Sequence, residues 1–220
     1  METERKELMC DGKKYNVIYA DPAWRFSQGI NRRKDIREKF GTNEELSIQY
    51  PTMSDKEIIE LNVADYADDN CVLFLWTTDA HLEVAIKAIN NWGFKYKTVA
   101  FTWNKKRGFM GKWTVKQCEI CLLATKGTAH KLLKSFKEKS YLEENKTEHS
   151  KKPNEFRKRI ERMFGDVPKL EMFARTRTEG WDAWGNETDK FEEGCEVSTE
   201  YYAAQEARFK EFKSQLRLFG

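Results

Sequence analysis

Four consecutive residues near the start of the chain combine groups that can handle a proton and contact a planar ring. Asp21 supplies a carboxylate, Pro22 a conformationally restricted carbonyl and Trp24 an indole, with Ala23 between them. The apolar run at 15–20 has the β-branched and aromatic content of a buried strand. Because proline cannot donate a ladder hydrogen bond, we expect this strand to end at Asp21. The carboxyl ends of strands in open α/β sheets bind ligands, so the pattern predicts either a site or a strand-ending turn with a packed Trp.

The composition describes a globular protein without a strong overall charge. The 220 residues are enough for one domain plus an appendage, and 13% aromatic residues argue against disorder. Lys and Arg number 39 against 36 Asp and Glu, which gives a net charge of +3. This balance excludes a histone-like polycation, although clustered bases could still form a local phosphate-binding face.

Other features of the sequence bear on location and on metal binding. The charged residues 1–7 lack a signal-peptide apolar region, and no apolar run approaches the ~20 residues of a membrane span. We therefore expect a soluble, cytoplasmic protein. The pair Cys118 and Cys121 has C-x-x-C spacing but no second ligand pair, so we interpret these residues as reduced structural thiols and predict no metal site.

Signals for strands and helices alternate along the first half of the chain. A polar, basic stretch at 25–49 is either a mobile lid over an anionic ligand or a solvated loop. Ser54 and Glu57 have capping-box spacing, which predicts a helix over 55–62. A continuous apolar run at 72–76 indicates a central strand, and helical periodicity at 79–92 follows it.

The second half begins with two strand-like segments and continues with helical ones. Strands are predicted at 97–103 and 118–125, joined by a basic, Gly-rich segment, so the sheet gains an antiparallel hairpin at one side. A helix is predicted at 153–164, whose basic residues we expect on a solvated face, and a short strand at 169–175. Residues 1–190 should form the main domain. Residues 191–220 should add an amphipathic helix, which either docks on that domain or binds a partner helix.

Nine short blocks, in a fixed order over residues 15–188, resemble the MT-A70 family of S-adenosylmethionine-dependent adenine-N6 methyltransferases. The blocks are YADPAW (19–24), YPTMS (50–54), LFLW (73–76), GKW (111–113), EICL (119–122), TKG (125–127), HSKKPNEF (149–156), LEMFAR (170–175) and GW followed by WGNE (180–187). The resemblance implies a Rossmann-like α/β methyltransferase fold, with a mostly parallel sheet and helices on both faces. It also implies S-adenosyl-L-methionine as the cofactor and a nucleic acid as the substrate, and a homo- or hetero-dimer is compatible with it.

The resemblance also implies roles for individual residues. Asp21, Pro22, Ala23 and Trp24 would hold a flipped adenine, with Asp21 also beside the cofactor. The residues that would bind the cofactor are Lys152, Arg175, Asn186 and Glu187. The residues that would contact the substrate are Tyr50, Trp113 and Glu119, and the basic loop of Lys105, Lys106 and Arg107 would grip phosphates.

Two departures from the family pattern stand out. Ala23 occupies a position where relatives usually carry proline, which loosens the expected pocket geometry, and Arg177-Thr178 replaces a common His-Asn pair. The leading interpretation is a DNA adenine methyltransferase of phage or prophage type. The alternatives are an RNA adenosine methyltransferase and a catalytically silent nucleic-acid-binding subunit; cytosine-N4 methylation is disfavoured because those relatives usually open the block with Ser.

Overall fold

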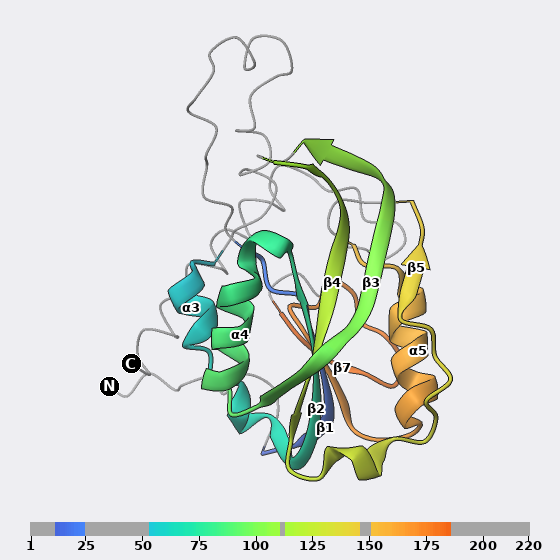
Figure 1. The fold of residues 1–220 in the computed structure, drawn as a ribbon. Helices are drawn as coiled ribbons and strands as arrows, with labels where there is room; N and C mark the ends of the chain where they lie inside the picture. Colours follow the sequence, from blue (N-terminus) through green and yellow to red (C-terminus); the bar gives the residue numbers. More distant parts are fainter. Residues whose placement is uncertain (1–11, 25–52, 111–112, 146–150, 186–220) are drawn as a thin grey trace, which may run out of the picture.

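A seven-stranded sheet forms the centre of the protein (Figure 1). The computed structural model describes residues 12–24, 53–110, 113–145 and 151–185, without the side chains of 107–110. The strands, in the order β5-β3-β4-β2-β1-β6-β7, are β1 (Tyr15–Ala20), β2 (Ala67–Thr77), β3 (Lys95–Met110), β4 (Val115–Lys126), β5 (Tyr141–Glu143), β6 (Lys169–Met172) and β7 (Asp182–Trp184). Only β4 runs antiparallel to its neighbours, β2 and β3. The other six strands therefore point their carboxyl ends to one edge, and the predicted mostly parallel sheet with a hairpin is confirmed.

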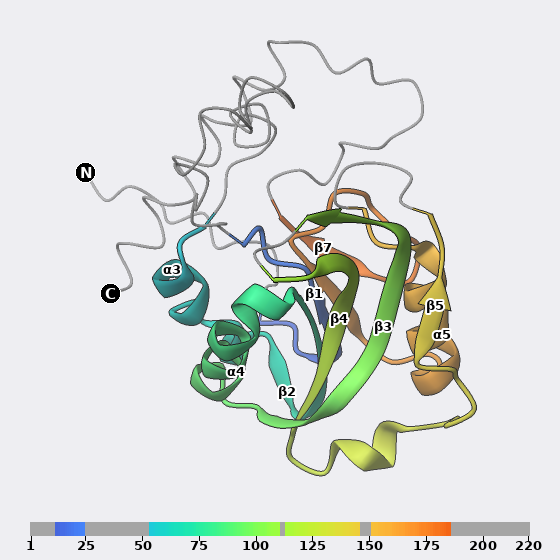
Figure 2. The same cartoon turned by 45° about the horizontal axis from the view of Figure 1, so that its top comes forward.

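Helices cover both faces of this sheet, as expected. On one face lie α3 (Asp55–Ile59) and α4 (Leu82–Asn91), and on the other lies α5 (Asn154–Phe164) (Figures 1 and 2). Three 3₁₀ turns, η1 (Val63–Asp65), η2 (Asp79–His81) and η3 (Ala129–Leu132), complete the described helical segments.

Strand β2 shows why a continuous apolar run belongs at the centre of the sheet. Leu73 and Leu75 pack into the core beneath α3 and α4, whereas Phe74 and Trp76 pack into the core beneath α5. Successive strand residues face opposite sides, so a strand covered by helices on both sides needs apolar residues at every position.

The start of α3 follows the local sequence signal closely. The Ser54 side chain accepts a hydrogen bond from the Glu57 amide while the Glu57 carboxylate accepts one from the Ser54 amide, so the predicted capping box is confirmed. The helix ends at Ile59, earlier than the predicted residue 62, with Glu60 as its C-cap, and η1 follows from Val63. Similarly, α4 begins at Leu82 rather than at 79, because residues 79–81 form the tighter turn η2.

Helix α5 packs through Phe156, Ile160 and Phe164, one residue per turn. The expectation that its basic residues form a solvated face was wrong for two of them. Arg159 is 7% exposed and donates to the carbonyls of Lys139 and Tyr141, and Arg157 pairs with a carboxylate of β6. These arginines hold neighbouring backbone and strand against the helix.

The β3–β4 hairpin extends beyond the rest of the sheet at the edge where the parallel strands end (Figures 1 and 2). Trp113 lies in the segment that connects β3 to β4 and is 93% exposed. Strands β5 and β7 were not predicted as strands; each has three residues, too few for a period-2 pattern to register.

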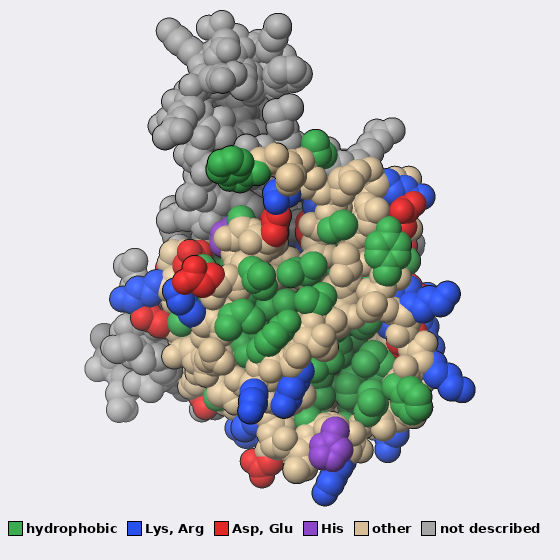
Figure 3. All heavy atoms as spheres, viewed as in Figure 1, with side chains coloured by type: hydrophobic (Ala, Val, Ile, Leu, Met, Phe, Trp, Pro, Cys, Tyr) green, Lys and Arg blue, Asp and Glu red, His purple; other side chains and the backbone are tan. Residues whose placement is uncertain are grey.

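The surface seen in Figure 3 carries apolar side chains at its centre and Lys and Arg side chains mostly around its margin. Exposed large apolar residues of the neighbouring elements include Leu82 of α4 and Tyr96 and Val99 of β3. Among the described residues on this face, the basic side chains do not gather into one patch.

Some expected features lie outside the described residues. They are the polar stretch at 25–49, Tyr50, Asn186, Glu187, the segment 191–220 and the side chain of Arg107. Within the part of the chain that is described, no helix has the length and apolar character needed to cross a membrane.

Candidate active site

Asp21 lies at the carboxyl end of β1, between the ends of two parallel neighbours. The preceding residue, Ala20, pairs with Leu75 of β2 on one side and Met172 of β6 on the other. The Asp21 amide donates to the Met172 carbonyl at 3.4 Å, which continues the ladder by one residue. Pro22 then ends the strand, so the Asp21 carboxylate sits at the edge of the sheet that suits ligand binding.

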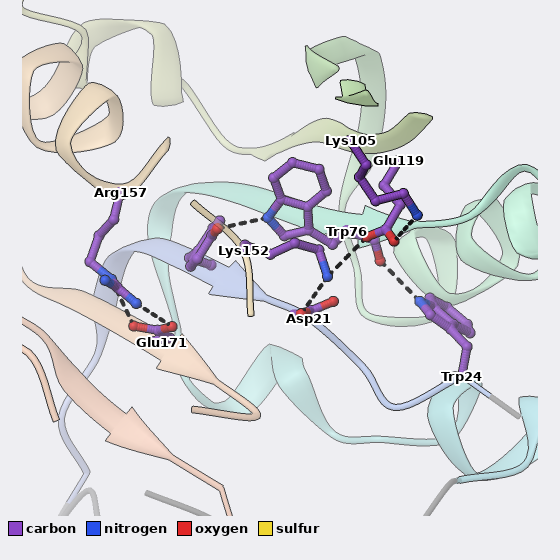
Figure 4. A network of polar contacts seen from close by, with 9 residues as sticks. Asp21, Trp24, Trp76, Lys105, Glu119, Lys152, Arg157 and Glu171 are labelled. Atoms are coloured by element: carbon purple, nitrogen blue, oxygen red, sulfur yellow. Dashed lines mark hydrogen bonds and ion pairs between the residues drawn. The ribbon is translucent and has the colours of Figure 1, made fainter. Parts of the chain in front are cut away.

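Four charged side chains form a continuous chain of contacts at this edge (Figure 4). The Lys152 Nζ lies 2.6 Å from Asp21 Oδ2 and 3.2 Å from a Glu119 oxygen, and Lys105 Nζ lies 2.8 Å from the other Glu119 oxygen. The Lys152 side chain is only 8% exposed. Buried charges of this kind need paired partners, and here the two signs alternate.

The net pKa shifts of the two carboxylates, Asp21 and Glu119, have opposite directions. Burial raises the pKa of Asp21, although Lys152 opposes that shift. Burial acts in the same sense on Glu119, but Lys152 and Lys105 outweigh it and lower the pKa of Glu119 to about 2. For Lys152, burial favours the neutral amine, but the attraction of both carboxylates prevails and raises its pKa. Asp21 is therefore the more basic carboxylate and the better proton acceptor, while Glu119 is a permanent anion.

The Lys152 amine also contacts the aromatic ring of Trp76. Its Nζ lies 5.3 Å from the centroid of the Trp76 ring, within the range of a cation–π contact. The Trp76 indole donates to the Tyr19 hydroxyl at 2.7 Å, and burial raises the pKa of Tyr19 well above its ordinary value. The tyrosine therefore stays a neutral partner that fixes the indole.

Trp24 is buried at the other end of the turn formed by residues 21–24. Its side chain belongs to the core beneath α3 and α4, the residue is 6% exposed, and the indole Nε1 donates to the Trp76 carbonyl at 3.1 Å. The ring stacks on His81 with 5.3 Å between centroids and an interplanar angle of 24°. The Trp24 amide donates to the Pro22 carbonyl at 2.9 Å. The position of Trp24 is therefore coupled to that of the Pro22 carbonyl.

A second ion pair lies on the β6 side of Asp21. Arg157 of α5 donates to both oxygens of Glu171, at 2.9 and 2.8 Å, in a bidentate pair (Figure 4). Burial raises the pKa of Glu171 against the opposing pull of Arg157, and the nearby Asp21 charge adds to the rise.

The structure brings together some of the residues singled out in the sequence and separates others. Asp21, Lys152 and Glu119 meet at one point, and Lys105 joins them with a side chain only 11% exposed. Lys105 thus faces inward onto Glu119, whereas Lys106, with 47% of its side chain exposed, lies 3.7 Å from Glu143.

Sequence reasoning missed three participants: His81, Glu171 with its partner Arg157, and Tyr19 as an anchor for Trp76. A signal existed for two of them. His81 follows the carboxyl end of a predicted central strand, and Glu171 lies on the short strand predicted at 169–175. Their contacts with residues 14 to 57 positions away leave no trace in local spacing.

The two cysteines of the C-x-x-C pair differ in environment: Cys118 is exposed and Cys121 is buried. Residues three positions apart on a strand face opposite sides, which separates these thiols. In the described residues, no group of three or more His, Cys, Asp or Glu side chains is placed to hold a metal ion.

The fold and the site describe an α/β protein with a carboxylate–lysine ion pair at the carboxyl edge of a Rossmann-like sheet, and comparison with known proteins identifies the family. The MT-A70 family model matches residues 15–187, and the chain belongs to this family of methyltransferases. The type II methyltransferase M.MunI from Mycoplasma sp. is 36% identical over 182 residues, which cover 80% of this chain and 78% of that protein.

Eukaryotic relatives share the same region at lower identity. The human N(6)-adenosine-methyltransferase catalytic subunit METTL3 is 28% identical over 187 residues, and a probable N(6)-adenosine-methyltransferase MT-A70-like protein of Oryza sativa subsp. japonica is 29% identical over 183 residues. These matches cover 80% and 79% of this chain but only 28% and 23% of the relatives. The chain therefore spans about a quarter of their length.

Proposed function

We propose that this protein transfers a methyl group from S-adenosyl-L-methionine to the N6 amino group of adenine in DNA. The observation that carries the proposal is the partly buried contact between Asp21 and Lys152, residues 131 positions apart, at the carboxyl edge of the sheet. Its other support is membership of a methyltransferase family whose relatives bear adenosine-N6 names.

The target amino group is a weak nucleophile because its lone pair is delocalised into the adenine ring. Asp21 and the Pro22 carbonyl would each accept one N–H of that group and so favour a pyramidal nitrogen. Both acceptors have room for this: a carboxylate has about four lone-pair sites, and the carbonyl uses one of its two for Trp24. Asp21, the more basic carboxylate, would then take up the released proton, directly or through water.

The residues around Asp21 suit a cofactor that carries both charges. Lys152 and Arg175 would pair with its anionic or hydroxyl groups, and Asn186 and Glu187 would hydrogen-bond its polar parts. One local observation favours this assignment: a Cβ on Gly185 would meet the Ala174 backbone at 2.7 Å. Glycine therefore lets the segment that leads to Asn186 lie directly against the one that leads to Arg175. When bound, the cofactor supplies a methyl group activated by a sulfonium charge.

Substrate contacts beyond the base would come from the hairpin side. A base inside a duplex is out of reach and must be extruded into the site. Trp113, 93% exposed, would stack on or wedge against bases near the extruded nucleotide, and Lys106 with Arg107 and Tyr50 would add phosphate and pocket contacts.

DNA is favoured over RNA by the relative that matches over most of both chains. The type II designation of that relative points to DNA modification, and 78% of its length is covered, whereas the adenosine-methyltransferase relatives are covered by about a quarter. An RNA adenosine methyltransferase is the second candidate, because those relatives share the same blocks. A silent binding subunit is disfavoured by the presence of Asp21, Lys152 and Arg175.

The proposal is tested with methyl-labelled S-adenosylmethionine and three substrates of matched sequence. These are duplex DNA, the same duplex with every adenine already N6-methylated, and the corresponding RNA. We expect label in the first DNA only, recovered as N6-methyladenine after digestion. Label in RNA alone would replace DNA by RNA as the substrate, and binding of DNA without transfer to any substrate would assign a silent subunit.

A further inference from the structure

His81 contacts Trp24, in the turn of residues 21–24, and lies outside the nine sequence blocks shared with the family. It closes η2, just after the carboxyl end of β2, and is 6% exposed. Its ring lies on the Trp24 indole, and its Nδ1 lies 3.0 Å from the Thr78 hydroxyl. An ion pair between Asp79 of η2 and Lys116 of β4 connects η2 to the hairpin. The imidazole is therefore held in place by its own turn as it covers Trp24.

The Trp24 indole behaves as an anchor. One of its faces is taken by His81, and its only N–H is used on the Trp76 carbonyl. An adenine that stacked on the covered face would have to displace the imidazole. Trp24 can still act on the reaction through its backbone, because its amide holds the Pro22 carbonyl at 2.9 Å.

Within the described residues, the turn between Asp21 and Trp24 has two further backbone restraints. The Met53 amide donates a hydrogen bond to the Ala23 carbonyl at 3.1 Å, and an isolated β-bridge joins Trp24 to Met53. Ala23 leaves the backbone freer here than the proline usual in relatives would, since alanine does not fix φ. The buried Trp24 side chain therefore contributes more to fixing the backbone of this turn than it would with proline at position 23.

We propose that His81 is a positioning residue: by stacking on Trp24 it fixes the turn that aims the Pro22 carbonyl and the Asp21 carboxylate at the target amino group. This inference rests on the proposed methyl transfer and adds a residue to it. His81 acts through Trp24 and touches neither substrate nor cofactor. Small errors in the placement of reacting groups reduce rates strongly, so the effect belongs in kcat.

The experiment compares three variants of the 220-residue chain. His81→Ala removes the stack, His81→Phe keeps a planar ring, and Trp92→Phe is the matched control. Trp92 is buried in the same core and donates its indole N–H to the Ile58 carbonyl at 3.1 Å, the same kind of bond that anchors Trp24, but away from Asp21. Each variant is assayed for kcat and KM on adenine-containing DNA, for cofactor affinity and for thermal unfolding.

We expect His81→Ala to lower kcat about tenfold or more, with KM and cofactor affinity within about twofold of the parent. His81→Phe should recover most of kcat, and Trp92→Phe should lower the unfolding midpoint but keep kcat. Equal kcat in the His81→Ala and Trp92→Phe variants would reduce His81 to a core residue. A His81→Phe variant as slow as His81→Ala would assign the imidazole a chemical role instead.

A second readout does not depend on methyl transfer. Hydrogen exchange of the Trp24 amide, followed by NMR, reports the bond to the Pro22 carbonyl directly. Exchange should accelerate in His81→Ala, and stay slow in His81→Phe and Trp92→Phe. Unchanged Trp24 protection in folded His81→Ala would overturn the inference even if the parent protein modifies a different nucleic acid.

Discussion

At the scale of single residues, two carboxylates share one lysine and differ in the direction of their pKa shifts. Lys152 touches both Asp21 and Glu119, yet only Glu119 has a second lysine beside it. That second cation makes Glu119 a fixed anion and leaves Asp21, with its raised pKa, as the group able to receive a proton. The assignment gives Asp21 and Glu119 different consequences when each is removed.

Replacement of Asp21 by Ala should reduce turnover by roughly 10²–10⁴-fold, the range for positioned proton-handling groups. Cofactor affinity should largely survive, because Lys152 keeps Glu119 as a partner. Single-turnover methyl transfer and equilibrium cofactor binding measure the two quantities. Full turnover by a folded Asp21→Ala protein would remove Asp21 from the mechanism.

The pH dependence of kcat should carry the signature of Asp21. Activity requires the carboxylate form, so kcat falls as the pH drops through a pKa that is raised above the ordinary aspartate value. The Glu119 charge contributes to that rise by disfavouring a second negative charge. In Glu119→Gln the acidic limb should therefore move to lower pH, which a pH–rate profile detects. A limb that stays in place or moves to higher pH contradicts the assignment.

At the scale of elements, helix α5 and the sheet place Lys152. The lysine directly precedes Pro153, the N-cap of α5, so the docking of the helix fixes where the amine lies. Phe156 anchors that docking against Trp76 and Phe101, with ring centroids 5.0 and 5.2 Å away.

Phe156→Ala should lower the free energy of unfolding by about 3–5 kcal/mol, the usual loss for a buried aromatic side chain. Denaturant unfolding measures this change. Tyr141→Phe, which removes a hydroxyl from a half-exposed edge-strand residue, serves as the control and should change stability little. A loss below about 1 kcal/mol for Phe156→Ala would mean that α5 is held mainly by its arginine contacts.

Elements with strong local signals could be predicted from the sequence, and those defined by distant contacts could not. The Ser54–Glu57 capping box and the apolar run in β2 carry their structural reason within a few residues. By contrast, β5 and β7 exist because longer neighbours offer free edges. Arg159 is buried because two carbonyls about 20 positions away meet its guanidinium. Likewise, the separate blocks predicted a site around Asp21, but the contact between Asp21 and Lys152 required the fold.

At the scale of the whole molecule, the hairpin and the turn of residues 21–24 lie at the same edge of the sheet (Figures 1 and 2). A net charge of only +3 gives little general attraction to nucleic acid, so local contacts must supply affinity. An exposed Trp at the hairpin is suited to such a contact.

Trp113→Ala should weaken nucleic-acid binding about 5- to 150-fold, equivalent to the 1–3 kcal/mol of one stacked base. Stability should not change, because the side chain is 93% exposed. Fluorescence anisotropy with labelled DNA measures the affinity. Phe136→Ala removes another exposed aromatic residue, 86% exposed and remote from the hairpin in sequence, and should leave the affinity unchanged. Equal losses in both variants would indicate non-specific contacts.

If Asp21 directs methyl transfer to adenine in DNA, methylated adenines should be found in cells that express the protein. Genomic DNA from cells expressing the parent protein is sequenced for N6-methyladenine beside DNA from cells expressing equal amounts of folded Asp21→Ala. We expect methylated adenines in a defined sequence context with the parent protein and none above background with the variant. Unmodified DNA with the parent protein, or equal methylation with both, would contradict it.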